Sequence, residues 1–132
     1  MHGIENQELI LDKVAVVILN WNGKEMLKTY LPTVIKNSPN VSVYVADNAS
    51  TDDSVSYVKT NFPSVKIIQN TLNHGYANGY NTALAKIEAE YYILLNSDVE
   101  VTSNWIDPII QLMDKERSIA ACQPRSEERR VG

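Results

Sequence analysis

Three polar residues, Asn96, Ser97 and Asp98, follow an uninterrupted apolar run at residues 91–95. Five consecutive apolar residues predict a strand that is covered on both faces, as in the middle of a parallel sheet. Strand residues two apart point the same way, so we expect Asn96 and Asp98 to project together. Their amide and carboxylate oxygens would suit an oxygen-rich ligand or a hard cation such as Mg²⁺ or Mn²⁺. A turn followed by a helix cap is the alternative for the same three residues.

Three further short apolar segments also end in polar residues. They predict strands at residues 14–19, 41–46 and 65–69. The polar residues that follow are Asn20 and Trp21 after the first, Asp47 and Asn48 after the second, and residues 70–75 after the third. Each predicted strand therefore delivers side chains with hydrogen-bonding capacity at its carboxyl end.

Helical periodicity separates the predicted strands. We expect helices at residues 24–37, from about 52 to 62, at 76–87, and from 103 or 104 onward. Ser50 or Thr51 is expected to cap the second helix. In the last helix, the expected inner face is Trp105, Ile109, Leu112 and Met113. Residues 118–122 could form a fifth strand.

This alternation of strands and helices predicts an α/β fold with a Rossmann-like parallel sheet flanked by helices. In a parallel sheet the carboxyl ends of all strands lie at the same edge, where open α/β sheets bind ligands. The four polar strand ends are therefore expected to converge on one site. That site would offer an aromatic ring, amides and two carboxylates, which suit a nucleoside with a metal-held diphosphate.

Composition and missing motifs exclude several classes of function. The 132 residues carry a net charge of -4 and no basic stripe, so nucleic acid is not expected as a partner. The first strand is followed by neither GxGxxG nor GxxxxGK[ST], which excludes the two commonest phosphate-binding turns. The single Cys122 cannot form an internal disulfide, and no apolar run is long enough for a transmembrane segment. We expect a cytoplasmic protein.

Four segments together resemble the family 2 glycosyltransferases, which are inverting enzymes with a nucleotide-sugar donor and the GT-A fold. The segments are VVILNWNG at residues 16–23, ADNASTDDS at 46–54, NHGYANGYNTAL at 73–84 and YYILLNSDVEV at 91–101. The resemblance covers residues 14–124 and corresponds to the donor-binding half of the family. It implies the strand order 3-2-1-4, numbered along the chain.

The resemblance also implies roles for individual residues. Asn20 and Trp21 would line a base pocket, and Asp47 would hydrogen-bond the pyrimidine ring with Asn48 beside it. Residues 96–98 occupy the place of the family's DxD motif. The nucleotide-binding set implied in this way is Asn20, Trp21, Asp47, Asn48, Asn96 and Ser97.

At the DxD position this chain departs from the family pattern. Asp98 would hold the divalent cation, Mg or Mn, that bridges the donor's diphosphate. The first acid is replaced by Asn96, a neutral oxygen ligand or ribose contact, so the cation should bind more weakly than it does to two carboxylates. Such NxD variants resemble a rhamnosyltransferase-like branch of the family.

The reaction implied by the resemblance transfers a sugar with inversion from a UDP- or dTDP-sugar to a hydroxyl of a saccharide or lipid-linked acceptor, in polysaccharide biosynthesis. A place at the inner face of the membrane would suit such an acceptor. The general base is expected beyond the end of this chain, so no catalytic residue is named and the fragment is expected to be inactive alone. We expect an incomplete GT-A domain at residues 1–124 and a non-native tail at 125–132.

Two other classes share these features. A non-catalytic nucleotide-binding module would have the same polar edge. A flavodoxin-like or receiver-like regulatory domain would also be a small parallel α/β unit, but with the strand order 2-1-3-4 and an acidic pair after the first strand, where this chain has Asn20, Trp21 and Asn22. The strand order separates these possibilities.

Overall fold

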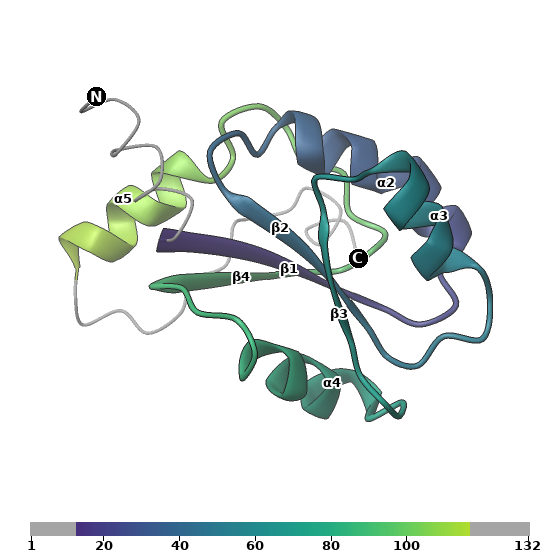
Figure 1. Cartoon of the computed structure of the whole chain (residues 1–132). Helices are drawn as coiled ribbons and strands as arrows, with labels where there is room; N and C mark the ends of the chain where they lie inside the picture. Colours follow the sequence, from purple (N-terminus) through teal and green to yellow (C-terminus); the bar gives the residue numbers. More distant parts are fainter. Residues whose placement is uncertain (1–12, 117–132) are drawn as a thin grey trace, which may run out of the picture.

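The computed structural model describes residues 13–116, in which four parallel strands alternate with four helices (Figure 1). The strands are β1 (Val14–Asn20), β2 (Ser42–Asp47), β3 (Lys66–Gln69) and β4 (Tyr91–Leu95). The helices are α2 (Lys24–Lys36), α3 (Ser54–Asn61), α4 (Gly75–Leu84) and α5 (Asp107–Lys115). The sheet order is β3-β2-β1-β4, as predicted. The regulatory alternative, which required 2-1-3-4, is therefore wrong.

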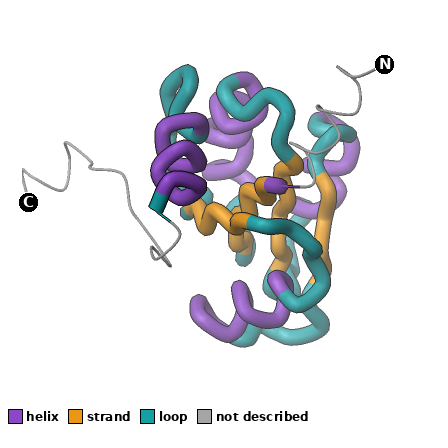
Figure 2. Tube along the Cα trace, turned by 90° about the vertical axis from the view of Figure 1, so that its left-hand side faces the viewer, coloured by secondary structure: helices purple, strands orange, loops and turns teal. Residues whose placement is uncertain are grey.

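Helices cover both faces of the sheet (Figures 1 and 2). On one face, Val16 and Ile18 of β1 pack with Leu27 and Leu31 of α2 in a core that α3 and α5 also join. On the other face, Val17 of β1 belongs to a smaller core that contains residues of α4. Because β1 is central, it is buried on both faces, which explains its unbroken run of β-branched and apolar residues.

The prediction that residues 91–95 are covered on both faces is wrong. Tyr91 and Ile93 pack against the larger core, whereas Tyr92 is 40% exposed and Leu94 is 49% exposed. In the described part of the chain β4 pairs with β1 alone, and α4 packs against β1 and β2 on that face. A continuous apolar run therefore marks here a strand with one covered face.

Several local predictions need correction. Neither Ser50 nor Thr51 caps α3, whose N-cap residue is Asp53 and has no side-chain capping bond. Leu112, expected on the inner face of α5, is exposed, and Ile106 just before the helix is buried instead. The predicted strand at 118–122 and the predicted tail at 125–132 lie outside the described residues. None of the helices between residues 13 and 116 is long and apolar enough to cross a membrane.

Candidate functional site at the carboxyl edge of the sheet

Strand register brings the polar strand ends to one level. Asn20 lies opposite Asp47 in the β1–β2 pair, and Asp47 lies opposite Gln69 in the β2–β3 pair. On the other side of β1, Leu95 pairs with Ile18. Parallel pairing with this register places the residues after all four strands along one edge of the sheet, as the sequence predicts.

Beneath that edge, Asn20 and Asp47 form a buried hydrogen-bonded pair. Their exposed fractions are 1% and 2%, and Asn20 Nδ2 donates to Asp47 Oδ1 at 2.9 Å. The same amide nitrogen donates to Ser54 Oγ at 2.9 Å, and the Asn20 Oδ1 accepts the Gly23 N–H at 3.1 Å. The Asp47 carboxylate also accepts the backbone N–H and the hydroxyl of Ser50, at 3.0 and 2.6 Å. These bonds hold the loops after β1 and β2 together.

A second connection joins the same two loops at the surface. Asn22 has a positive φ of 51°, a conformation that asparagine tolerates better than most residues. Its Oδ1 accepts the backbone N–H groups of Thr51 and Asp52, at 2.7 and 3.1 Å. Burial opposes ionisation of Asp52, but hydrogen bonds from Ser54 and the backbone outweigh it and lower the pKa of the Asp52 carboxyl. Asp52 and Asn22 are thus structural residues of the loops.

Asn48 connects β2 to the loop that precedes α4. Its Nδ2 donates to Asn73 Oδ1 and to the Gly75 carbonyl, both at 3.0 Å, while its Oδ1 accepts from Asn70 Nδ2 at 3.1 Å. Gly79 of α4 lies directly against this side chain: a Cβ on Gly79 would come within 2.8 Å of Asn48 Nδ2. The small residue lets α4 approach the sheet closely.

An open groove of about 460 Å³ lies above this framework. The residues that line it come from the ends of β1, β2 and β4, from the loop after β3, from α2 and from the start of α4. They are Leu19, Trp21, Met26, Asn48, Asn73, Gly75, Tyr76, Asn96, Ser97 and Asp98. Trp21 is 55% exposed, an unusual placement for a large aromatic side chain, and so offers a ring face to a ligand.

The structure thus divides the predicted site residues into two groups. Trp21, Asn48 and residues 96–98 line the groove, although Asn48 is itself buried, whereas Asn20 and Asp47 are buried and do not line it. The β4 strand ends at Leu95, so the strand periodicity used to align Asn96 with Asp98 does not extend that far, although both reach the groove. Direct contacts of Asn20 and Asp47 with a base stay predictions.

Sequence reasoning missed several groove residues, namely Leu19, Met26, Asn73 and Tyr76. Asn73 lies in the loop after β3, which was singled out only as a whole. Tyr76 falls in the first turn of a helix, and nothing in its local sequence signals that its hydroxyl meets the end of β4. Its Oη donates to Asn96 Oδ1 at 2.8 Å.

The groove fits a divalent cation only if a ligand brings further oxygen atoms. Asp98 is an exposed carboxylate, and the described chain contains no group of three His, Cys, Asp or Glu side chains that could hold a metal ion. Protein-bound Mg²⁺ commonly uses one or two carboxylates together with substrate phosphates. The donor set at residues 96–98 therefore suits a cation shared with phosphate groups.

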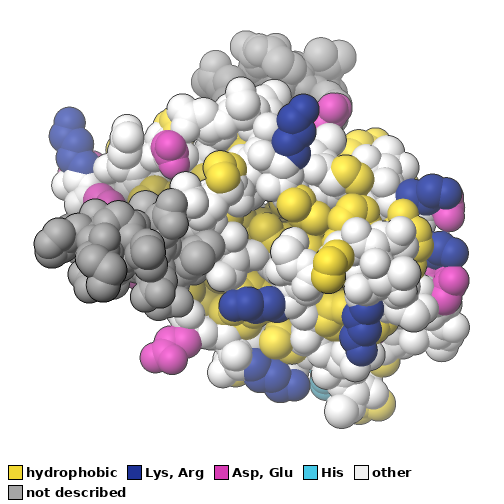
Figure 3. Space-filling model, turned by 45° about the horizontal axis from the view of Figure 1, so that its top comes forward, with side chains coloured by type: hydrophobic (Ala, Val, Ile, Leu, Met, Phe, Trp, Pro, Cys, Tyr) yellow, Lys and Arg dark blue, Asp and Glu magenta, His cyan; other side chains and the backbone are white. Residues whose placement is uncertain are grey.

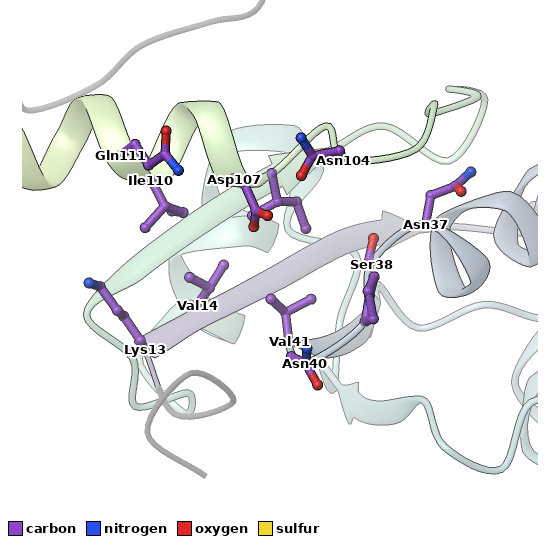
Figure 4. A pocket seen from close by; sticks show the side chains of 12 residues that line it. Lys13, Val14, Asn37, Ser38, Asn40, Val41, Asn104, Asp107, Ile110 and Gln111 are labelled. Atoms are coloured by element: carbon purple, nitrogen blue, oxygen red, sulfur yellow. The ribbon is translucent and has the colours of Figure 1, made fainter. Parts of the chain in front are cut away.

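A second cavity, of about 480 Å³, lies at the opposite end of the sheet (Figure 4). It is bordered by Lys13 and Val14 at the start of β1, by Ser38 after α2, and by Ile110 of α5. Trp105 Nε1 donates to Ser38 Oγ at 3.0 Å at this end. The polar strand ends are absent from its lining, so its position gives no reason to place the chemistry there.

Charged side chains of both signs lie on the surface of the described residues. On the face drawn in Figure 3, Lys side chains are interspersed with Asp and Glu, and hydrophobic side chains lie between them. A phosphate backbone is normally bound by basic side chains gathered on one face. The described part of this face therefore does not resemble a nucleic-acid interface.

Comparison with known proteins identifies the family. The sequence profile described as Glycosyl transferase family 2 matches residues 15–131. The chain therefore belongs to glycosyl transferase family 2. An uncharacterized glycosyltransferase of Haemophilus influenzae is 24% identical over 112 residues, which cover 82% of this chain and 35% of that protein.

Solved structures share the fold. The mannosyltransferase PcManGT of Pyrobaculum calidifontis, in complex with GDP-Man and Mn²⁺, has a TM-score of 0.62 at 23% identity, over 69% of this chain and 29% of that one. Residues 1–349 of S. aureus TarS in complex with UDP give 0.69 at 20% identity, over 86% of this chain and 38% of that one. The complex of the same TarS chain with UDP-GlcNAc gives 0.68 at 21% identity.

Proposed function

We propose that the groove at the carboxyl edge binds the nucleotide part of a sugar donor, and that the chain serves an inverting glycosyltransferase reaction. The observation that carries the proposal is the convergence of an exposed aromatic ring, Trp21, an exposed carboxylate, Asp98, and several amides on one groove. Ligands of open α/β sheets bind at this edge. The solved relatives carry GDP-Man with Mn²⁺, UDP or UDP-GlcNAc, which supports a nucleoside-diphosphate sugar as the class of donor.

In this proposal Trp21 packs against the base, and Asp98 holds an Mg²⁺ or Mn²⁺ ion together with the diphosphate. Such a cation stabilises the negative charge that develops on the leaving diphosphate. Asn96 and Ser97 offer hydrogen-bonding groups to the nucleotide. The side chain of Asn48, whose nitrogen and oxygen are already bonded within the protein, holds the wall of the groove, and its direct contact with the nucleotide stays a prediction. Asn20 and Asp47 support the base pocket from below through Ser50 and Gly23, in addition to any direct contact.

Four finer points stay predictions. They are a UDP- or dTDP-sugar as the donor, a saccharide or lipid-linked acceptor, a role in polysaccharide biosynthesis, and membership of the rhamnosyltransferase-like branch. The chain spans 35% of its curated relative, and its lack of transfer activity alone is likewise a prediction. A non-catalytic nucleotide-binding module would use the same groove. It would differ from a glycosyltransferase only in that the whole protein would transfer no sugar.

Calorimetric titration of UDP, with and without Mn²⁺, tests the proposal. We expect Mn²⁺ to tighten UDP binding and Asp98→Ala to abolish most of that enhancement, because the variant removes the groove's exposed carboxylate. Asp107→Ala is the matched control, since it removes an exposed carboxylate beside the second cavity. If Asp98→Ala retained the full Mn²⁺ enhancement, the cation assignment would be wrong.

A further inference from the structure

Two tyrosine hydroxyls of α4 hold the end of β4. Tyr80 is buried, and its Oη donates to the Leu95 carbonyl at 3.0 Å. One turn earlier, Tyr76 Oη donates to the side chain of Asn96 at 2.8 Å. The two rings pack edge to face, with centroids 5.1 Å apart. Helix α4 therefore donates one tyrosine hydroxyl hydrogen bond to the last residue of β4 and another to the first residue after it.

These contacts differ in what they do for the fold. Burial raises the pKa of the Tyr80 hydroxyl, so this group stays protonated and remains a donor to the backbone. Tyr76 is 64% exposed, and both it and Asn96 line the groove. An exposed hydrogen bond contributes little to stability, because water competes for both groups. The consequence of the Tyr76–Asn96 bond must therefore be sought in the groove.

A primary amide carries one acceptor oxygen and an NH₂ group with two donors. In the structure the Tyr76 hydroxyl donates to the amide oxygen, so the oxygen is the end of the Asn96 amide that faces Tyr76. An amide oxygen that accepts this bond is also less available to a cation, which would have to compete with the phenol for it.

We infer that Tyr76 is a positioning residue that keeps the Asn96 carbonyl oxygen away from the cation and leaves the Asn96 NH₂ group to donate to an oxygen atom of the nucleotide. The inference rests on the proposed nucleotide-binding role of the groove. The inference assigns different roles to Asn96 and Asp98. Asn96 binds the nucleotide directly, and Asp98 supplies the protein's anionic oxygen to the metal.

The orientation of Asn96 can be tested without any ligand, by NMR on the full 132-residue chain. Loss of a signal in Asn96→Asp assigns the Asn96 side-chain amide. Tyr76→Phe should then shift that amide signal. Tyr92→Phe is the matched control, because it removes a hydroxyl bond to the Ile87 carbonyl outside the groove, and it should leave the signal unchanged. An Asn96 amide that is the same in Tyr76→Phe as in the parent would overturn the inference.

The ligand side is tested by titrating UDP into the same variants, with EDTA or with Mn²⁺. Tyr76→Phe should weaken metal-free UDP binding by about threefold to tenfold, the worth of one hydrogen bond, because the Asn96 amide is no longer held in the orientation that donates to the nucleotide. It should also increase the enhancement by Mn²⁺, since the Asn96 oxygen becomes available. A parallel titration with uridine separates a ribose hydroxyl from a phosphate oxygen as the acceptor, because only the former survives in uridine.

The outcomes of this titration are distinct. Unchanged metal-free affinity in Tyr76→Phe, or a smaller Mn²⁺ enhancement, would overturn the inference while UDP binding by the parent chain still supports the proposed function. Absence of UDP binding by the parent chain, with or without Mn²⁺, would overturn the proposed function and the ligand contact together. The amide signals decide the orientation of Asn96 in either case.

Discussion

At the level of single residues, Trp21 is a large aromatic side chain that the fold leaves largely exposed, whereas such side chains are mostly buried. Its ring is 55% exposed beside Asn20, which is almost completely buried and belongs to the loop framework. Neighbouring residues thus have separate tasks. Asn20 orders the loop, and the ordered loop presents the ring of Trp21 at the groove.

We predict that Trp21→Ala weakens UDP binding by about 1 to 3 kcal/mol, the usual worth of stacking between a base and an aromatic ring. The free energy of unfolding should change little, because an exposed side chain contributes little to the core. Calorimetry and urea unfolding measure the two quantities. Leu72→Ala, which truncates an exposed side chain outside the groove, is the control and should alter neither.

The division between buried and exposed site residues was not predictable from the sequence. The polar residues after the strands identify the edge at which the site lies, because parallel strands share their carboxyl ends. Asp47 is the last residue of β2 and Asp98 lies in the loop after β4, yet the first is buried under bonds from Ser50 and the second is exposed. Such a difference depends on how the following loops fold back, which is a tertiary property.

At the scale of secondary structure, the docking of α4 positions much of the groove. Helix α4 carries Gly75 and Tyr76 at its start, and Asn48 bonds to the Gly75 carbonyl. Its close approach depends on Gly79, where a Cβ would come within 2.8 Å of Asn48 Nδ2 and 3.1 Å of the Leu19 side chain. Asn48 itself is fixed by Asn70 and Asn73, so it has little room to move away.

We therefore predict that Gly79→Ala destabilises the protein by about 1 to 3 kcal/mol through overpacking. Helix propensity alone predicts the opposite sign, a gain of about 1 kcal/mol. Ala77→Gly, at an exposed position of the same helix, is the control and should cost only the propensity term. Free energies of unfolding in urea measure both changes. A stabilised Gly79→Ala protein would contradict the role given to this contact.

Secondary-structure positions were largely predictable, because short apolar segments and helical periodicity alternate along the chain. The predicted strand at 41–46 differs from β2 (Ser42–Asp47) by one residue at each end. Burial was less predictable. The residues of β4 are as apolar as those of β1, but β1 has strands on both sides and β4 has one neighbour within the described sheet. The sequence of a single strand does not show whether that strand lies in the middle of a sheet or nearer its edge.

At the scale of the whole molecule, the sheet is covered unevenly. Within residues 13–116, three helices contribute to the core on one face, whereas α4 is the one helix that packs on the other and leaves Tyr92 and Leu94 exposed. Adjacent residues of β4 should therefore respond differently to the same substitution. Ile93 packs against the larger core, and Leu94 points to the less covered face.

We predict that Ile93→Thr lowers the free energy of unfolding by about 1 to 3 kcal/mol, because it introduces a hydroxyl and removes packed methyl groups. Leu94→Thr should change it by no more than about 0.5 kcal/mol, since its side chain is half exposed. Both variants place a β-branched threonine in the strand. Equal losses in urea unfolding would show that the second face of β4 is also covered.

The nucleotide is proposed to bind at the carboxyl edge of the sheet, and the two tryptophans of the chain lie near the two opposite edges of that sheet. Trp21 lies in the groove, and Trp105 donates to Ser38 at the other cavity. We propose to follow both indole N–H signals by NMR while UDP and Mg²⁺ are added. We predict that the Trp21 signal shifts in a saturable manner while the Trp105 signal stays in place. A saturable shift of Trp105 with an unchanged Trp21 would contradict it.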